Sequence, residues 1–259
     1  MNLLSSTDLT LVVGDTHIAP GQNLSRATLL GKAINELRPK RVVFIGDFLN
    51  FDSLSAWDKD KRKLMEGRRY QKDIDSGRKF LDLMFAEKDK MSFTKIEWIL
   101  IEGNHEDRLW RYLDKQPLFD GAVDYRVDLG IDHWKHISYK QHYLHKGVYF
   151  THVPIMENGR PVSGDTACKR SLGIYQHSVV FGHTHKLASV SVHRHGASHL
   201  NQALNVGCYF DHIDDYALGS VTSYWRGLVL IDHYKEGRFN WTPISLGKLR
   251  KVYGKARSK

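Results

Sequence analysis

Short apolar runs recur along the chain, and glycine or polar residues follow most of them at once. The runs are rich in valine, isoleucine and leucine, which is typical of strands inside a sheet. They predict β-strands over residues 9–13, 41–45, 96–101, 147–151, 179–181, 188–193, 202–206 and 227–232. Glycine and polar residues between the runs mark the turns that would separate these strands.

Two stretches have the spacing of amphipathic helices. In residues 24–37 the apolar side chains fall on one side, and Pro39 ends the pattern. Residues 52–91 form a longer segment with helical spacing. Its apolar face consists of Tyr70, Ile74, Gly77, Leu81 and Met84. Strands that alternate with helices in this way predict a layered α/β or α+β domain.

Five of the predicted strands are followed by a residue that can bind a metal ion or a proton. These residues are Asp15, Asp47, Asn104, His152 and His183. Loops at the ends of sheet strands are where such domains build their sites. Five placements of this kind are hard to attribute to packing, so we expect the side chains to converge.

The same loops contain further candidate ligands. His17 lies two residues after Asp15, and His185 lies two residues after His183. A set of carboxylates, imidazoles and one amide oxygen suits Mn²⁺, Fe or Zn²⁺ and contains too much nitrogen for Ca²⁺. Seven ligands are too many for one tetrahedral ion, but they fill two ions well if one carboxylate bridges them.

A pair of such ions has a known use in phosphoryl chemistry. The ions clamp the oxygens of an in-line displacement at phosphorus and activate a water molecule. The leaving oxygen still needs a proton, so an uncommitted histidine is expected nearby. His105 follows Asn104 directly and is not needed as a ligand, which makes it the candidate general acid.

The ordered series GD-x-H, GD, GNH[DE], H and GH-x-H resembles the calcineurin-like metallophosphoesterase superfamily, and it spans Asp15 to His185. The resemblance implies an α+β fold, a four-layer αββα sandwich of two facing β-sheets flanked by helices. It also implies a metal-dependent hydrolase with two divalent ions. Manganese is the expected metal, with iron, zinc and nickel as alternatives.

The resemblance also assigns a role to each matching residue. It implies that one ion is held by Asp15, His17, Asp47 and His185. It implies that the other is held by Asp47 as the bridge, Asn104, His152 and His183. His105 takes the place of the general acid or transition-state stabiliser.

Three positions near these motifs need separate interpretation. Asn50 lies where several branches, including the serine/threonine protein phosphatases, have Asp followed by Arg, which weakens the protein-phosphatase hypothesis. Glu106 lies where nuclease branches more often have Asp, but this position is not a metal ligand. Arg108 is close enough to His105 in the chain to bind a substrate phosphate, or else it is a surface ion-pair partner.

We expect one domain over residues 1–259 with two basic additions. The first is a helical insertion at about 52–93, where nine Lys/Arg face five Asp/Glu between Asp58 and Lys79. It is either a solvated outer helix or a cap that contacts phosphates. The second is a C-terminal tail at 248–259, with six basic residues and no acidic one, which we expect to be mobile.

The formal net charge of +9 favours a polyanionic partner. The leading hypothesis is a nuclease or phosphodiesterase acting on DNA or RNA, and the alternative is a phosphomonoesterase for nucleotides or other small phosphoesters. An inactive scaffold on the same fold is a third hypothesis, but a scaffold has no need of a complete ligand set. Four aromatic residues could offer stacking faces to bases: Trp57, Tyr70, Trp110 and Tyr112.

The sequence also suggests a location. No apolar run approaches the roughly 18 residues needed to span a bilayer. The N-terminus has neither the basic region nor the cleavage site of a signal peptide. Cys168 and Cys208, without CxxC spacing, fit a reducing compartment. We therefore expect a cytoplasmic protein with no membrane partner.

Overall fold

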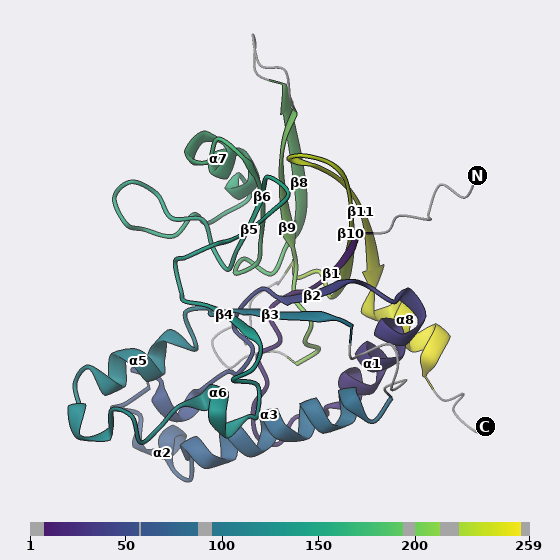
Figure 1. Cartoon of the computed structure of the whole chain (residues 1–259). Helices are drawn as coiled ribbons and strands as arrows, with labels where there is room; N and C mark the ends of the chain where they lie inside the picture. The colour runs from purple at the N-terminus through teal and green to yellow at the C-terminus, as the bar shows by residue number, and fades with distance from the viewer. Residues whose placement is uncertain (1–7, 57, 88–94, 194–199, 213–222, 255–259) are drawn as a thin grey trace.

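The predicted strands all belong to two mixed β-sheets that face each other (Figure 1). The computed structural model describes residues 8–56, 58–87, 95–193, 200–212 and 223–254. Trp57 and the tail residues 255–259, for which predictions are given above, lie outside this range.

The first sheet has six strands in the order β11-β10-β1-β2-β3-β4. Its strands are β1 (Leu9–Val13), β2 (Arg41–Phe44), β3 (Glu97–Ile101), β4 (Lys135–Ile137), β10 (Gly227–Lys235) and β11 (Arg238–Ser245). β1 to β4 run parallel, whereas β10 is antiparallel to both β1 and β11. The carboxyl ends of β1, β2 and β3 therefore meet at one edge of the sheet.

The second sheet has five strands in the order β5-β6-β7-β9-β8. Its strands are β5 (Tyr143–His145), β6 (Val148–Thr151), β7 (Ser178–Phe181), β8 (Leu187–His193) and β9 (Leu200–Val206). β6, β7 and β9 are parallel, and the outer strands β5 and β8 are antiparallel to their neighbours.

Alternating side chains of each central strand enter different cores. In β1, Val12 faces the second sheet, where it shares a core with Phe150 and Val180. Leu11 and Val13 belong to the core on the other face, beneath the helices. This period-two alternation buries both faces of the strand, which explains why its sequence is apolar except for Thr10.

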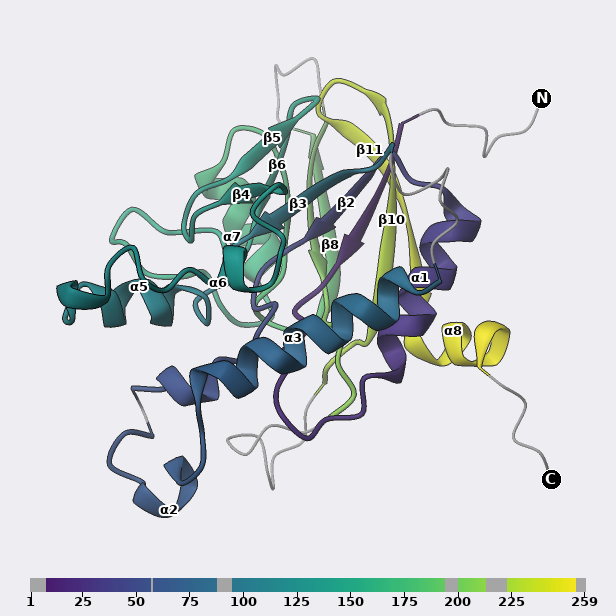
Figure 2. The same cartoon turned by 60° about the horizontal axis from the view of Figure 1, so that its bottom comes forward.

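Helices cover the outer face of each sheet, as Figures 1 and 2 show. The first sheet is covered by α1 (Ser25–Leu37), α3 (Tyr70–Phe85) and α8 (Leu246–Tyr253), and the second by α7 (Ala167–Ile174). The four-layer αββα sandwich is therefore confirmed. The single-domain organisation stays a prediction.

The insertion and the tail differ from the continuous helix and mobile segment that we expected. In its described residues, 52–56 and 58–87, the insertion contains a 3₁₀ turn η1 (Asp52–Leu54), a short α2 (Arg62–Met65) and the long α3. Gly67 interrupts the helical pattern with a positive φ of 74°. Residues up to Tyr253 of the tail form α8, which buries Leu249 in the core, so this part is not a mobile arm.

The pattern failed to predict several smaller elements. These are β4, β5, β11, η2 (Pro117–Phe119), α5 (Asp107–Leu113), α6 (Tyr125–Asp128) and α7. β11 contains Pro243 and several exposed polar residues, which is compatible only with an edge strand. β4 and β5 have three residues each and are too short to give a periodic signal.

A buried histidine on β10 makes stability depend on pH. His233 is only 4% exposed, and neither ring nitrogen has a hydrogen-bond partner among the described residues. Burial lowers its pKa to about 3, with the nearby charges of His145, Arg41 and Lys146 adding to the effect and Asp8 opposing it. Below pH 6.5 the unfolded chain takes up a proton that the folded protein excludes, so stability falls as the pH falls.

We predict that His233→Phe will remove part of this acid sensitivity. Between about pH 7.5 and pH 5, the wild-type protein should lose about 2 kcal/mol more unfolding free energy than the variant. Urea unfolding at both pH values measures the difference. His133→Phe, which replaces an exposed histidine, is the control and should retain the wild-type slope. Identical slopes for wild type and His233→Phe would contradict the prediction.

Candidate metal centre

The candidate ligands lie in loops that leave the carboxyl ends of β1, β2, β3, β6 and β7. Four of these residues adopt a left-handed backbone conformation, which is uncommon outside glycine. Their φ angles are 42° at His17, 47° at Asp47, 67° at His183 and 59° at His185. Such conformations have an energetic cost and cluster at functional sites, where they direct side chains that a regular strand could not.

Two motif glycines allow the loops to approach each other. A Cβ on Gly103 would lie 2.1 Å from Oδ1 of Asp47, and a Cβ on Gly182 would lie 2.3 Å from Oδ1 of Asp15. Both distances are far below van der Waals contact. Any side chain at these glycines would therefore displace a carboxylate from the site.

Asp15, His17 and His185 form the first group of ligand atoms, all within 4.8 Å of one another. The Oδ2 atom of Asp15 lies 3.1 Å from Nε2 of His185. The Nε2 atoms of His17 and His185 lie 3.2 Å apart. All three residues are buried.

Asp47, His152 and His183 form the second group, again within 4.8 Å. Nε2 of His152 lies 3.2 Å from Nδ1 of His183 and 3.2 Å from the side-chain oxygen of Asn104. The same Nε2 is 3.5 Å from Oδ2 of Asp47. The predicted amide ligand therefore lies beside the predicted imidazoles.

Asp47 lies between the two groups. Its Oδ2 atom is 3.6 Å from Nε2 of His17 in the first group and 3.5 Å from Nε2 of His152 in the second. Its other oxygen, Oδ1, accepts a hydrogen bond of 2.9 Å from the backbone N–H of His105. One carboxylate oxygen is thus directed at both groups.

The atoms that converge here are mostly acceptors, which is the environment of a cation. Nδ1 of His152 donates to the carbonyl of Ile45 at 3.0 Å, so Nε2 carries a lone pair directed at Asn104 and Asp47. Burial lowers the pKa of His152, and it lowers that of His183 to about 4. Neutral imidazoles and carboxylates are the forms that bind metals, so these residues fit a pair of divalent ions.

The two buried carboxylates differ in their electrostatic balance. Burial favours the neutral form of Asp15, but the hydrogen bond with His185 and the neighbouring His152 outweigh it and lower its pKa. At Asp47 burial dominates and the charge of Asp15 adds to it, so the pKa is raised despite His17. Divalent cations would relieve the cost of keeping both carboxylates ionised.

His105 lies at the edge of both groups. Its Nδ1 donates to the carbonyl of Asn50 at 2.7 Å, and its Nε2 accepts from Nη2 of Arg108 at 3.1 Å. Nε2 of His105 is 3.9 Å from Oδ2 of Asp47. His105 also forms a further group of possible ligand atoms with His17 and Asp47, so it could bind a metal ion itself. Burial, helped by His17 and Arg108, lowers the pKa of His105 well below 6.5.

Glu106 connects the loops that carry two of the ligands. Its buried carboxylate accepts backbone hydrogen bonds from Asp47 (3.0 Å), Leu49 (3.0 Å) and Gly103 (2.8 Å). Burial and the charge of Asp47 raise its pKa to about 8, whereas the donors at Gly103 and Leu49 oppose this. Its position is consistent with the expectation that it is not a ligand, and it acts as a clamp between the β2 and β3 loops.

Sequence analysis missed other residues around the centre. The ring of Phe210 lies edge-on to His17 (5.1 Å) and His185 (5.0 Å), closing one side of the first group. The Tyr139 ring lies 6.1 Å from that of His152 in the second group. Neither residue belongs to a ligand motif, so no sequence pattern points to either of them. Asn50 differs from these two residues, because it follows the motif residue Asp47 by only three positions and so stands out in the sequence.

Two of the proposed stacking residues are engaged within the protein. Tyr70 stacks on Phe51 and donates to Asp128 at 2.6 Å. Trp110 donates to Glu102 at 2.9 Å. Tyr112 is 45% exposed and remains accessible. Tyr70 and Trp110 are therefore better explained by packing than by base stacking.

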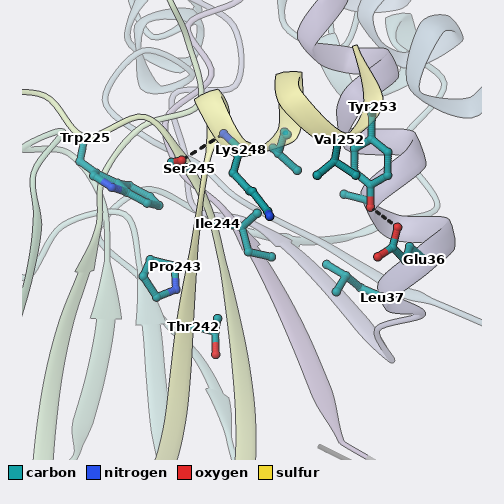
Figure 3. A pocket seen from close by; sticks show the side chains of 12 residues that line it. Glu36, Leu37, Trp225, Thr242, Pro243, Ile244, Ser245, Lys248, Val252 and Tyr253 are labelled. Carbon is teal, nitrogen blue, oxygen red and sulfur yellow. Dashed lines mark hydrogen bonds between the residues drawn. The ribbon is translucent and has the colours of Figure 1, made fainter. Parts of the chain in front are cut away.

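Two cavities in the described part of the chain contain none of the candidate ligands. The larger, of about 430 Å³, lies between α1, β11 and α8, and Figure 3 shows Trp225 and Tyr253 in its walls. A smaller one of about 300 Å³ includes Tyr139 and Glu102 and so borders the second group. Among the described residues, no helix has the length and apolar character needed to cross a membrane.

Comparison with known proteins identifies the family. The sequence has no significant match among curated proteins. One solved structure matches 92% of this chain and 99% of its own at 10% identity and a TM-score of 0.42, a likeness too distant for inference. The family model for calcineurin-like phosphoesterases matches residues 9–187, more than half of the chain and the whole span of the strand-end motifs. The chain therefore belongs to the calcineurin-like phosphoesterase family and is a metal-dependent hydrolase.

Proposed function

We propose that this phosphoesterase hydrolyses phosphodiesters, with nucleic acid as its substrate, and that two manganese ions support the reaction. The observation that carries the proposal is the position of Asp47 between two groups of imidazoles and carboxylates. A second candidate is a phosphomonoesterase for nucleotides or other small phosphoesters. The complete ligand set argues against an inactive scaffold.

Each ion would have its own set of ligands. The first would be held by Asp15, His17, Asp47 and His185, and the second by Asp47, Asn104, His152 and His183. A mixed oxygen and nitrogen set suits manganese, with iron, zinc and nickel as alternatives. When bound, the ions would supply Lewis-acid activation of water and of the phosphoryl oxygens.

The positively charged side chains around the centre favour a phosphodiester, which carries one negative charge, over a phosphomonoester, which carries two. Asn50 is followed by Phe51 in the place where protein phosphatases have an arginine, and Phe51 is fully buried against Tyr70. Arg108 is the guanidinium in contact with His105, and its Nη1 is already bonded to the carbonyl of Asn50 at 2.9 Å. A substrate with one negative charge needs less compensation from such groups.

We propose that His105 delivers a proton to the leaving oxygen. Its Nδ1 proton is held by the carbonyl of Asn50, so a transferred proton would have to be carried by Nε2. Arg108 occupies that nitrogen in the resting protein. We propose that a substrate phosphate attracts the guanidinium of Arg108 and leaves Nε2 of His105 free to take and donate a proton.

Basic residues of the insertion extend the surface available to a polyanion. Lys59, Arg62 and Lys63 are exposed, and within the described residues no ion pair occupies them. They follow η1, which begins two residues after Asn50, so they are close in sequence to the loop that carries Asp47. Phosphates of the polymer other than the one that reacts could bind there.

We also propose a cytoplasmic location. The two cysteines, Cys168 and Cys208, are both buried and form no disulfide with each other, which agrees with a reducing compartment.

The choice of substrate class is tested by turnover with Mn²⁺ on a bis-aryl phosphodiester and an aryl phosphomonoester side by side. Single-stranded and duplex DNA and RNA are incubated in parallel, with EDTA as the control. We predict cleavage of the diester and of a nucleic acid, abolished by EDTA. Monoester turnover with intact nucleic acid would instead support the second candidate.

The shared carboxylate gives the strongest single-residue prediction. Asp47→Asn should weaken binding at both metal sites, because one oxygen of Asp47 faces both ligand groups. Isothermal titration with Mn²⁺ and metal analysis after dialysis measure this loss. Asp107→Asn removes a nearby carboxylate that pairs with Arg111 and should bind two ions as the wild type does. Loss of only one ion in Asp47→Asn would contradict the bridging role.

His105→Ala separates proton donation from metal binding. We expect turnover to fall by roughly 10²–10⁴-fold, which is typical of a lost general acid, while two ions remain bound. A diester with a very acidic leaving group needs little protonation, so it should be affected least. Loss of metal in the variant would mean that His105 is a ligand, as its distance of 3.9 Å to Asp47 would allow.

A further inference from the structure

The side chain of Asn50 lies behind His17 and has hydrogen bonds at both ends of its amide. Its Oδ1 is 2.8 Å from Nδ1 of His17, and its Nδ2 donates to Oδ1 of Asp52 at 2.9 Å. The backbone carbonyl of the same residue accepts from Nδ1 of His105. Asn50 thus contacts both a candidate ligand and the candidate acid.

The partners determine which way the amide is oriented. An ionised carboxylate can only accept, so Asp52 must face the NH₂ group of Asn50, and the amide oxygen must face His17. That oxygen also only accepts, so the proton of His17 is on Nδ1. The lone pair is then on Nε2, the atom that lies 3.2 Å from His185 in the first ligand group.

The insertion in turn holds Asp52 in place. Nη1 of Arg68, between α2 and α3, donates to the backbone carbonyl of Asp52 at 3.3 Å and lies 3.9 Å from its carboxylate. In α3, the buried Asp73 accepts from the hydroxyl of Ser53 at 2.6 Å and from its backbone N–H at 3.3 Å. The start of the insertion is therefore held in place by Arg68 and Asp73, two residues of the insertion itself.

We propose that Asn50 and Asp52 are positioning residues that set the tautomer and orientation of His17 for metal binding. The insertion then supports the first metal site through Arg68 and Asp73, in addition to any contact with substrate. This inference rests on the proposed metal centre. Outer hydrogen bonds of this kind fix the ring of a ligating histidine and increase its basicity as a ligand.

An exchange of the two side chains tests the proposal. Asn50→Leu removes the acceptor for His17, and Asn50→Asp places two carboxylates against each other. Asn50→Leu should weaken Mn²⁺ binding at the first site by about 10–100-fold, the usual effect of losing such a partner. Asn50→Asp should also weaken it, because the repulsion between its carboxylate and that of Asp52 turns the side chain away from His17. The double variant Asn50→Asp/Asp52→Asn restores acceptor and donor at the same net charge, and its affinity should return close to that of the wild type.

Two readouts distinguish this inference from the proposed function. Titration calorimetry measures metal affinity, and ¹⁵N NMR of the histidine rings in metal-free protein measures the tautomer of His17. The Nδ1–H form should dominate in the wild type and in the double variant but not in Asn50→Leu. If the wild type bound no metal, the proposed function would fail, but the NMR result would still decide the tautomer.

Asp58→Asn is the matched control. Asp58 pairs with Arg68 at 3.2 Å but has no hydrogen bond to Asn50 among those in the described residues, so metal affinity should be unchanged. The proposal is overturned if Asn50→Leu keeps wild-type affinity and tautomer, or if the folded double variant binds no better than Asn50→Asp. It is also overturned if Asp58→Asn weakens binding as much as Asn50→Asp does.

Discussion

The rest of the site depends on the convergence of buried acceptor atoms around Asp47. Two groups of imidazoles and carboxylates, drawn from four strand-end loops, meet at one carboxylate oxygen. Without a cation, this arrangement has little to balance it: burial raises the pKa of Asp47 and lowers that of the neighbouring His152. A pair of divalent ions would bind tightly here. The ligands are already buried and held in place, so they would need little reorganisation when the ions bind.

Contacts between the loops hold this arrangement in place. Parallel strands bring the carboxyl ends of β1, β2 and β3 to one edge, and the facing sheet brings β6 and β7 to the same place. The carboxylate of Glu106 holds the β2 and β3 loops together through three backbone donors. Gly103 and Gly182 leave the space that Asp47 and Asp15 occupy. The left-handed conformations at His17 and His183 are thus maintained by contacts that come from several strands.

Much of this framework could be predicted from the sequence, because both β1 and β7 are apolar on two faces and each is followed at once by a ligand motif. The motifs also gave the candidate ligands, which the structure brings together. β11 could not be predicted in this way, since its exposed edge residues and Pro243 obscure the strand pattern. The contacts of Asn50 with His17 and of Glu106 with Leu49 were not predictable either. They depend on how loops distant in the sequence meet, and local periodicity contains no information about that.

The central claim is that two ions share Asp47. A crystal structure of the Mn²⁺-loaded protein, with anomalous data at the manganese edge, tests it most directly. We expect two anomalous peaks about 3.5–4 Å apart, with the carboxylate of Asp47 between them. A single peak, or two peaks of which only one contacts Asp47, would contradict it.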